Sequence, residues 1–250
     1  MRKFIFLVFV AVMGLSVAHA QLVTDLETGL NFSGYNDVGV PGNNPGNIFS
    51  LQNNLGSNAS FFIRARVTYT LAEKHNISVL IAPFTKTYKG KPKQNFNFAG
   101  ENYSSLYETT AKYKFNSWRL TYRWDFVRSK HLQVGVGLTG KIRDAKISIK
   151  GKGGTGTVIE SSTSNVGFVP LINFFFAWKF TQCMDFRIEG DALAAPQGRA
   201  EDVFIGWTGN ISDKLKLKVG YRLLEGGADN NTVYNFALFH YIVLGLMFQI

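Results

Sequence analysis

The sequence predicts an all-β protein, a single antiparallel transmembrane β-barrel of about ten strands with a cleaved N-terminal signal peptide. Three observations support this prediction. The N-terminus has the form of an export signal, charged and apolar residues alternate along the rest of the chain, and the links between the alternating segments are short and long in turn. Alternation with a period of two over about ten residues is typical of strands that cross a membrane.

The first twenty residues have the three parts of a secretory signal. Arg2 and Lys3 form the positive segment, residues 4–17 form an apolar run, and Ala18-His19-Ala20 matches a small-x-small cleavage site. We therefore expect residues 1–20 to be a signal peptide and residues 21–250 to be the barrel. No later segment reaches the roughly 20 apolar residues that a membrane helix needs. The expected location is the bacterial cell outer membrane.

Composition agrees with one large exported β domain. The chain has 22 Phe, 10 Tyr, 4 Trp and 25 Gly, and its single cysteine, Cys183, excludes an intramolecular disulfide framework. The 27 basic residues outnumber the 17 acidic ones. Such a charge favours anionic partners, so we expect contacts with outer-membrane lipids and lipopolysaccharide. Nucleic acid is not an expected partner of an exported chain.

Alternation is clearest in the stretch FFIRARVTYTL. Phe61, Ile63 and Val67 share one face, and Arg64 and Arg66 share the other. Arginine on the lipid face costs about 2–4 kcal/mol near the bilayer midplane, so the apolar face is predicted to meet lipid and the arginines a polar lumen. The alternative is a soluble sandwich or lipocalin-like barrel with its apolar face inward. Its exterior would not need so many aromatic residues.

The predicted strands follow one another with turn signals between them. They span residues 22–35, 59–72, 76–88, 104–127, 131–149, 164–180, 184–195, 201–211, 215–224 and 232–250. Short turns at 73–75, 128–130, 181–183 and 212–214 alternate with longer polar links at 36–58, 89–103, 150–163, 196–200 and 225–231. Short periplasmic turns and longer external loops are typical of outer-membrane barrels. An even number of strands places both termini on the periplasmic side.

The fourth and fifth predicted strands are too long for a bilayer and are expected to project beyond it. Their alternation breaks at Asn116-Ser117 and at Arg143-Asp144, which a hairpin would place side by side. We expect paired β-bulges there, near the outer membrane surface. A tight turn at Asn116-Ser117 is the alternative, but it gives an odd number of strands. Trp124, Phe126, Trp178 and Phe180 precede short turns, where an aromatic girdle is expected.

Together the leader, the alternating strands, the linker pattern and the final YIVLGLMFQI resemble a small bacterial outer-membrane β-barrel protein. The Phe- and Asn-rich composition is similar to that of uncharacterised outer-membrane proteins of the Bacteroidetes. This resemblance covers residues 21–250 and rests on pattern rather than on a specific motif. It implies insertion from the periplasm by the barrel-assembly machinery. Such barrels usually end in an aromatic residue, whereas this chain ends in Ile250 with Phe248 two places earlier.

Basic residues on the polar faces of the strands are predicted to line the lumen. They are Arg64, Arg66, Arg119, Arg123, Lys141, Arg187, Lys216, Lys218 and Arg222. Asp125, Glu189 and Asp191 are expected to neutralise them in part. The primary interpretation is a filled basic lumen in a protein of envelope structure or surface binding. A narrow, porin-like channel that prefers anions is the alternative.

Polar residues of three further segments are predicted to meet at the external mouth of the barrel. They are Arg143, Asp144, Gln197, Arg199, Glu201, Asp202, Glu225 and Asp229. One interpretation is a site that binds a ligand or makes the protein an outer-leaflet lipid-modifying hydrolase. The other is a salt-bridged plug, because a narrow barrel fills its interior with side chains.

Catalytic signals are weak. Ser33 and His240 lie on strands that would close against each other, but the alternation places them on opposite faces, and a nucleophile must reach its base. No cluster of cysteine, histidine or acidic residues has metal-ligand spacing, and GKGGTG lacks the spacing of a phosphate-binding loop. We therefore assign no catalytic residue and expect neither a metal nor another cofactor. The identity of the ligand is left open.

Overall fold

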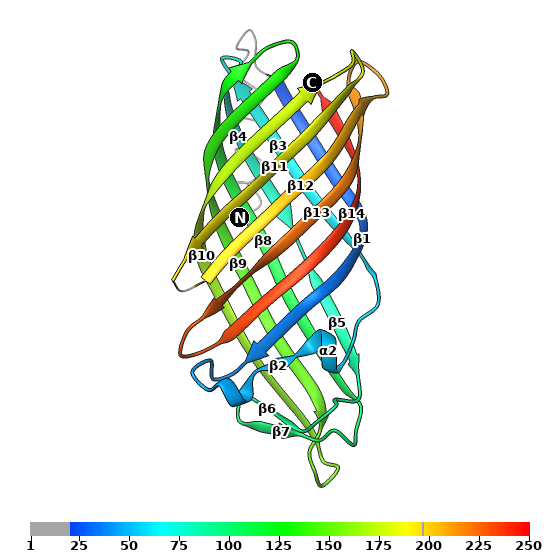
Figure 1. The fold of residues 1–250 in the computed structure, drawn as a ribbon, viewed down its shortest axis with the longest axis vertical. Coiled ribbons are helices and arrows are strands. Elements are labelled where there is room, and N and C mark those ends of the chain that lie inside the picture. The colour runs from blue at the N-terminus through cyan, green and yellow to red at the C-terminus, as the bar shows by residue number, and fades with distance from the viewer. Residues whose placement is uncertain (1–20, 197) are drawn as a thin grey trace, which may run out of the picture.

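The computed structural model describes residues 21–196 and 198–250; the predicted signal peptide and Gln197 lie outside the described residues. The chain forms a closed antiparallel barrel with ten strands in its wall, which confirms the predicted fold class and strand number (Figure 1). Each wall strand pairs with the next along the chain, and β14 closes the barrel against β1. Among the described residues, no helix has the length and apolar character needed to cross a membrane.

The wall strands agree with the predicted ones in order and approximate position. They are β1 (Gln21–Gly39), β3 (Ser60–Leu71), β4 (His75–Ala82), β8 (Thr109–Arg128), β9 (Leu132–Lys152), β10 (Val158–Lys179), β11 (Met184–Ala195), β12 (Gly198–Asn210), β13 (Leu215–Asp229) and β14 (Tyr234–Gln249). A short strand, β5 (Thr85–Gly90), follows β4 after Pro83 and pairs with the first residues of β8, Thr109 to Lys114. The sequence analysis predicts one continuous strand over residues 76–88. The strand breaks between β4 and β5 because Pro83 lacks the N–H that a ladder needs.

The two ends of the barrel differ. One end, called here the turn end, has the short turns, and there Leu22 pairs with Ile250 through their backbones. The other, the loop end, has η1 (Pro45–Asn47), β2 (Phe49–Ser50), α2 (Leu51–Asn54), β6 (Phe96–Phe98) and β7 (Glu101–Tyr103) (Figure 1). In outer-membrane barrels the short turns are periplasmic and the long loops face the cell exterior.

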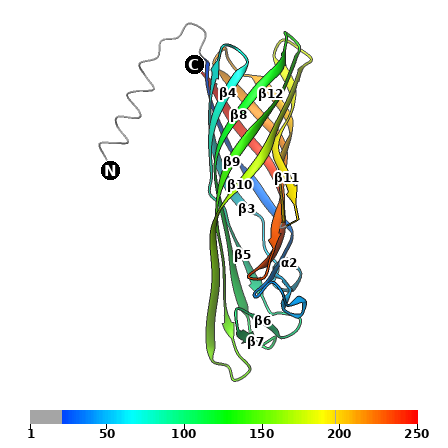
Figure 2. The same ribbon diagram turned by 90° about the vertical axis from the view of Figure 1, so that its left-hand side faces the viewer.

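Three strands, not two, project at the loop end. β8, β9 and β10 have 20, 21 and 22 residues. The predicted sixth strand starts at Val158 instead of residue 164, and the predicted link 150–163 shrinks to residues 153–157. Figure 2 shows the hairpin of β9 and β10 continuing well beyond the ends of β11 and β12. The segment VIESSTS combines β-branched residues with Glu and Ser, which suits a strand that faces water.

The predicted paired bulges are wrong. Asn116 pairs with Asp144 and Ser117 with Arg143, so the two breaks do lie side by side, but the ladder runs through them without a register shift. The shifts lie elsewhere, between Trp124 and Val127 in β8 and between Ser33 and Tyr35 in β1.

What changes at these positions is the environment of the strand. On the turn side, Leu120 and Leu138 face outward, and Lys141 is buried in the lumen. On the loop side, Tyr113 and Ile147 point inward and are only 2% and 4% exposed. A barrel in lipid needs an apolar exterior, whereas a barrel in water needs an apolar interior. The inversion of the pattern therefore marks the outer membrane surface.

Charged groups occupy the exterior immediately beyond this boundary. The Nζ of Lys114 donates to the Asp144 carboxylate over 2.8 Å on the outer face. This hydrogen bond lowers the pKa of the Asp144 carboxyl. The pair lies where lipid gives way to water, so both side chains remain hydrated.

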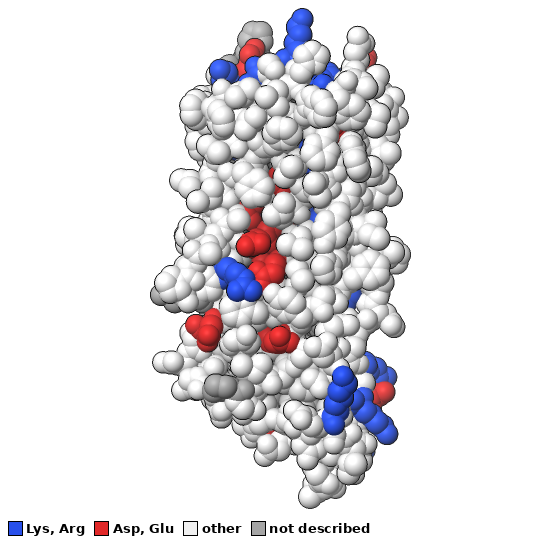
Figure 3. Space-filling model, in the orientation of Figure 1, with Lys and Arg blue, Asp and Glu red and all other residues white. Residues whose placement is uncertain are grey.

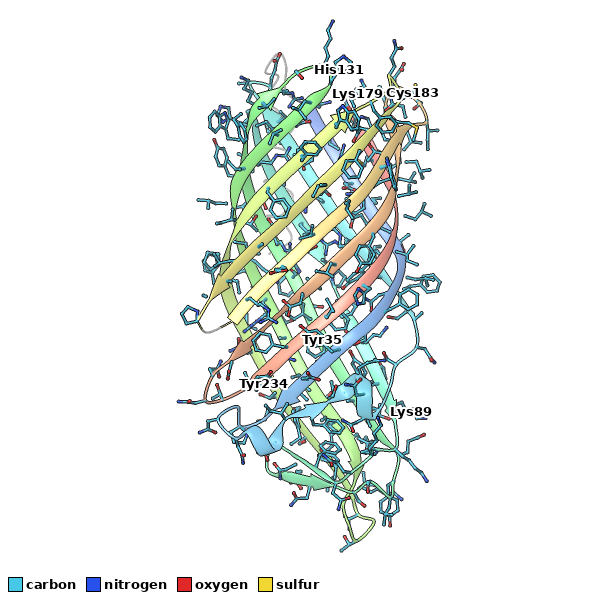
Figure 4. The ribbon with its side chains drawn as sticks, in the orientation of Figure 1. Tyr35, Lys89, His131, Lys179, Cys183 and Tyr234 are labelled. Atoms are coloured by element: carbon cyan, nitrogen blue, oxygen red, sulfur yellow. The ribbon has the colours of Figure 1, made fainter. Side chains whose placement is uncertain are left out.

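Between the boundary and the turn end the exterior is an apolar belt. Figure 3 shows charged side chains at the two ends and in one group partway along the wall, with a broad uncharged surface elsewhere. Trp124, Phe126, Trp178 and Phe180 face outward near the turn end, as predicted for an aromatic girdle. In Figure 4, His131, Lys179 and Cys183 mark the turn end, and Lys89 lies toward the loop end.

The loop half of the barrel has an apolar core of its own. Phe96 stacks between Phe49 and Tyr103, with ring centroids 3.8 and 4.9 Å apart. The first loop is held to the wall by Lys86, whose Nζ donates to the carbonyl oxygens of Asn31 and Asn58 over 3.1 and 2.8 Å. These contacts hold the loop segments against the loop end of the barrel.

The position of the belt predicts how single arginines affect stability. Leu138→Arg places a charge on a lipid-facing position that is 70% exposed, and we expect a loss of about 2–4 kcal/mol in the free energy of unfolding. Ser162→Arg, on the water-facing exterior of β10, should change it by less than about 0.5 kcal/mol. Urea unfolding of protein refolded in lipid vesicles measures both. Equal losses would contradict the assigned boundary.

Candidate functional site

All nine predicted lumen cations face the interior of the barrel. Acidic side chains accompany them in nearly equal number, which makes the lumen closer to neutral than the predicted basic lumen. These acids are Asp25, Glu27, Asp125, Asp185, Glu189, Asp191 and Asp202. Asp25, Glu27 and Asp185 were missed, although the spacing of two between Asp25 and Glu27 places both on one face of the first strand.

The centre of the lumen is crossed by a group of ion pairs, the ion network. Its members are Asp25, Glu27, Arg64, Arg119, Glu189, Asp191, Asp202, Lys218 and Arg222, none more than 6% exposed. They come from β1, β3, β8, β11, β12 and β13, on opposite sides of the barrel. The network therefore ties distant parts of the wall together.

Asp202 is the central anion of the ion network. It accepts from Arg119, Arg222 and Arg64 over 2.6, 2.7 and 3.0 Å. Arg119 also reaches Asp191 over 2.6 Å. Because β8 and β12 are not neighbours in the wall, the Arg119–Asp202 pair spans the lumen. Asp202 was predicted at the external mouth, and that assignment is wrong: the inward phase of β12 carries it into the network.

Lys218 is the second centre. Its Nζ lies 2.8 Å from Asp25 and 2.6 Å from both Glu27 and Glu189. Among the described residues, these three carboxylates are the group close enough to share a metal ion. The ammonium group already occupies the point where they converge and supplies the positive charge they need.

Two glycines make room for the Phe204 ring, which lies against Lys218 and Arg222. Gly206 and Gly220 face each other across β12 and β13, and a Cβ on either would lie within 3.0 Å of the Phe204 ring. The ring is fully buried, with Lys218 Nζ 4.4 Å and the Arg222 guanidinium 5.4 Å from its centroid. Cations over an aromatic face are favoured, more so when desolvated.

Nearer the turn end the pairs are looser. Arg123 binds Asp125 over 2.7 Å, and Arg187 and Lys216 share Asp185 over 3.3 and 3.8 Å. Here Lys216 remains 28% exposed at its side chain. Arg66, another predicted lumen cation, lies 3.9 Å from Glu189.

Above the ion network, toward the loop end, lies a cavity of about 370 Å³, the outer cavity. Its wall is mostly apolar and includes Phe115, Ile147, Leu193, Leu224 and Phe239. Two predicted residues, Lys141 of the lumen set and Arg143 of the external cluster, also line it.

The predicted external cluster is only partly brought together. Arg143, Arg199 and Glu225 all line the outer cavity. Asp229 is exposed at the end of β13, and Gln197 lies outside the described residues. Asp144 and Glu201 are not among the residues that line the cavity, and each has the opposite phase from the lumen residue next to it in its strand.

At the rim of the cavity the carboxylate of Glu225 is neutralised by Arg199. Arg199 donates to Glu225 over 2.9 Å from both its Nε and an Nη, and Tyr35 Oη donates to the same carboxylate. A two-point contact of this kind is among the stronger ion pairs.

Ser33 and His240 are separated by the wall, as the alternation predicts. Ser33 Oγ is 2.8 Å from Tyr88 Oη in the interior, whereas His240 pairs with Tyr221 on the exterior. The two side chains cannot exchange a proton directly.

The sequence matches no protein-family model and no curated protein sequence. Solved structures do match in fold. The outer membrane protease OmpT of Escherichia coli is 9% identical with a TM-score of 0.58, over 94% of this chain and 99% of that one. Ail, the attachment invasion locus protein of Yersinia pestis, is 9% identical with a TM-score of 0.38, over 92% of this chain and 99% of its own.

At 9% identity and a TM-score of 0.58, the likeness to OmpT concerns the fold alone. The closed barrel and its apolar belt are those of bacterial outer-membrane β-barrel proteins, and the chain belongs in that membrane.

The ion network predicts a strong effect of removing one buried partner. Lys218→Met leaves three buried carboxylates without their shared cation, and we expect a loss of about 3–5 kcal/mol in the free energy of unfolding. Lys216→Met is the matched control, with an expected loss below about 1 kcal/mol because Lys216 is partly hydrated. Urea unfolding in vesicles compares them. A Lys218→Met protein as stable as the control would contradict the network's structural role.

Proposed function

We propose that this chain is a non-conducting outer-membrane barrel that binds a ligand at the cell surface, in the outer cavity. The observation that carries the proposal is the order of the two features along the barrel axis. An ion network with members from opposite walls lies beneath a cavity on the loop side. The lumen is closed below the cavity, so a molecule that enters from outside has a site but no central passage.

Several contacts argue against the alternative of an anion channel. Arg64, Arg119, Lys218 and Arg222 each have at least two carboxylate oxygens of different residues within 3.2 Å. Conduction needs sites that bind an ion weakly enough to release it, and these cations are fully committed to fixed anions. These four of the nine predicted selectivity residues are therefore better suited to holding the barrel closed.

The outer cavity has the properties of a ligand site. Its volume falls in the range of small-molecule pockets, about 300–1,000 Å³, and a few polar groups interrupt a mostly apolar wall. It lies on the loop side of the network, which the barrel fold directs to the cell exterior. This supports surface binding over a purely structural role in the envelope.

Lysines on the outer face of β8 and β9 support lipopolysaccharide as a partner. Lys112, Lys146 and Lys150 are exposed beside Lys114, just beyond the apolar belt. Phosphates of the outer leaflet lie at this height, and clustered lysines attract them. Insertion by the barrel-assembly machinery and a relationship to Bacteroidetes proteins remain predictions from the sequence.

Planar-bilayer recording tests the proposal. We expect refolded protein to give no discrete conductance steps under a salt gradient. Folding is verified separately by the shifted gel mobility of the unheated barrel, and a refolded general porin serves as a positive control. Reproducible steps with anion selectivity, lost when Arg119 and Arg123 are changed to Glu, would instead establish the channel.

A further inference from the structure

The outer cavity borders a gap in the barrel wall. β10 pairs with β9 along its whole length from Val158, but it pairs with β11 only from Ile172 onward. Residues 158–171 therefore have no strand neighbour on their far edge among the described residues. The hairpin of β11 and β12 ends opposite this edge, and both sides line the cavity. We call this opening the wall gap.

The wall gap lies at the height of the membrane surface. Val166 and Phe168 face outward from β10 and are 68% and 67% exposed. Their ladder partners in β9 are Asp144 and Ile142, which lie on either side of the polarity inversion. The part of the gap nearer the turn end therefore borders the apolar belt, and the part nearer the loop end borders water. The gap is therefore accessible both from the outer leaflet and from water.

Inside the cavity two cations lack anionic partners. Lys141 is 2% exposed, and its Nζ lies 4.6 Å from the Phe115 ring centroid. This Nζ takes part in none of the ion pairs or side-chain hydrogen bonds found among residues 21–196 and 198–250, and the residue lines the outer cavity. Arg143 donates to Asn165 over 2.7 Å, but its buried Nε has no acceptor. A buried charge without a partner is costly, so an anion that binds beside these two groups would be stabilised by both.

The rest of the wall suits a hydrocarbon. Ile147, Leu193, Leu224 and Phe239 surround the space above Lys141. The rim carboxylate of Glu225 is neutralised by Arg199, so it does not repel an anion strongly. The apolar volume and the cationic floor together match a molecule with one anionic end.

We propose that the ligand of the outer cavity is an anionic amphiphile, a carboxylate or phosphate on an apolar chain. It enters through the wall gap and places its anionic group against Lys141 and Arg143. This inference rests on the proposed function and adds the ligand class and its route. An outer-leaflet lipid and a free amphiphile share this chemistry.

The test uses the full-length mature barrel in nanodiscs of phosphatidylcholine, with displacement of a fluorescent fatty carboxylate as the readout and empty nanodiscs as background. The affinity of dodecanoate, measured by displacement of the probe, should be at least about tenfold higher than that of dodecanol, since only the carboxylate meets the two cations. Lys141→Met should weaken dodecanoate about tenfold to a hundredfold and leave dodecanol unchanged. Lys179→Met, which removes a lysine at the turn end, is the matched control and should bind as the wild type does.

Leu224→Trp keeps both cations and fills the cavity, so it should abolish binding of both compounds; it also serves if Lys141→Met does not fold. Lipid extracted from protein purified from native membranes separates the two sources. A retained acylated phospholipid or glycolipid supports entry from the leaflet, and lipid-free protein that binds added dodecanoate supports a free amphiphile.

Equal affinity for dodecanoate and dodecanol, or unchanged dodecanoate binding in Lys141→Met, would overturn the inference. Failure of both compounds to displace the probe would overturn it as well. The proposed function fails on a different readout, because central conductance of the wild type would refute the closed lumen without bearing on headgroup selectivity.

Discussion

The structure depends on one electrostatic constraint: a barrel surrounded by lipid must keep its charges inside, and buried charges need partners. The exterior belt cannot carry arginine or lysine cheaply, so the polar phase of every membrane-spanning strand points to the lumen. The charged residues of the ion network are at most 6% exposed. Each cation of the ion network therefore bonds to carboxylates of other strands, as Arg119 does to Asp191 and Asp202.

The same constraint separates the barrel into two functional parts. Where lipid surrounds it, the interior is ionic, with Asp202 and Lys218 buried at its centre. Where water surrounds it, the interior becomes apolar, with Tyr113 and Ile147 buried. The outer cavity lies at the junction, and so it combines a hydrocarbon wall with Lys141 and Arg143. An amphipathic site follows from the place where the two interiors meet.

Much of the fold could be predicted from the sequence because alternation depends only on adjacent residues. Strand order, strand number and the lumen phase of Arg64 or Arg222 follow from it. The breaks at Asn116-Ser117 and Arg143-Asp144 were located correctly but interpreted as bulges, because a change of solvent and a change of register alter the pattern in the same way. Pairing of the ladder distinguishes them.

The candidate site was less predictable because it depends on contacts across the lumen. No local pattern shows that Asp202 meets Arg64, 138 residues away, or that Lys141 has no partner. The end of the pairing between β10 and β11 is likewise a property of two strands together. The external cluster was therefore predicted as one group, whereas its members divide between the network, the cavity and the exterior.

The ion network also bears on how the barrel assembles. Glu27 of β1 meets Lys218 and Arg222 of β13 across 191 and 195 residues of chain, so these pairs form only when the first and last strands come together. Until then a partly inserted sheet carries unpaired charges that lipid does not tolerate. Contacts of such long range make closure slow but cooperative. Charge pairing thus links closure of the wall to completion of the interior network, because the last hairpin contributes to both.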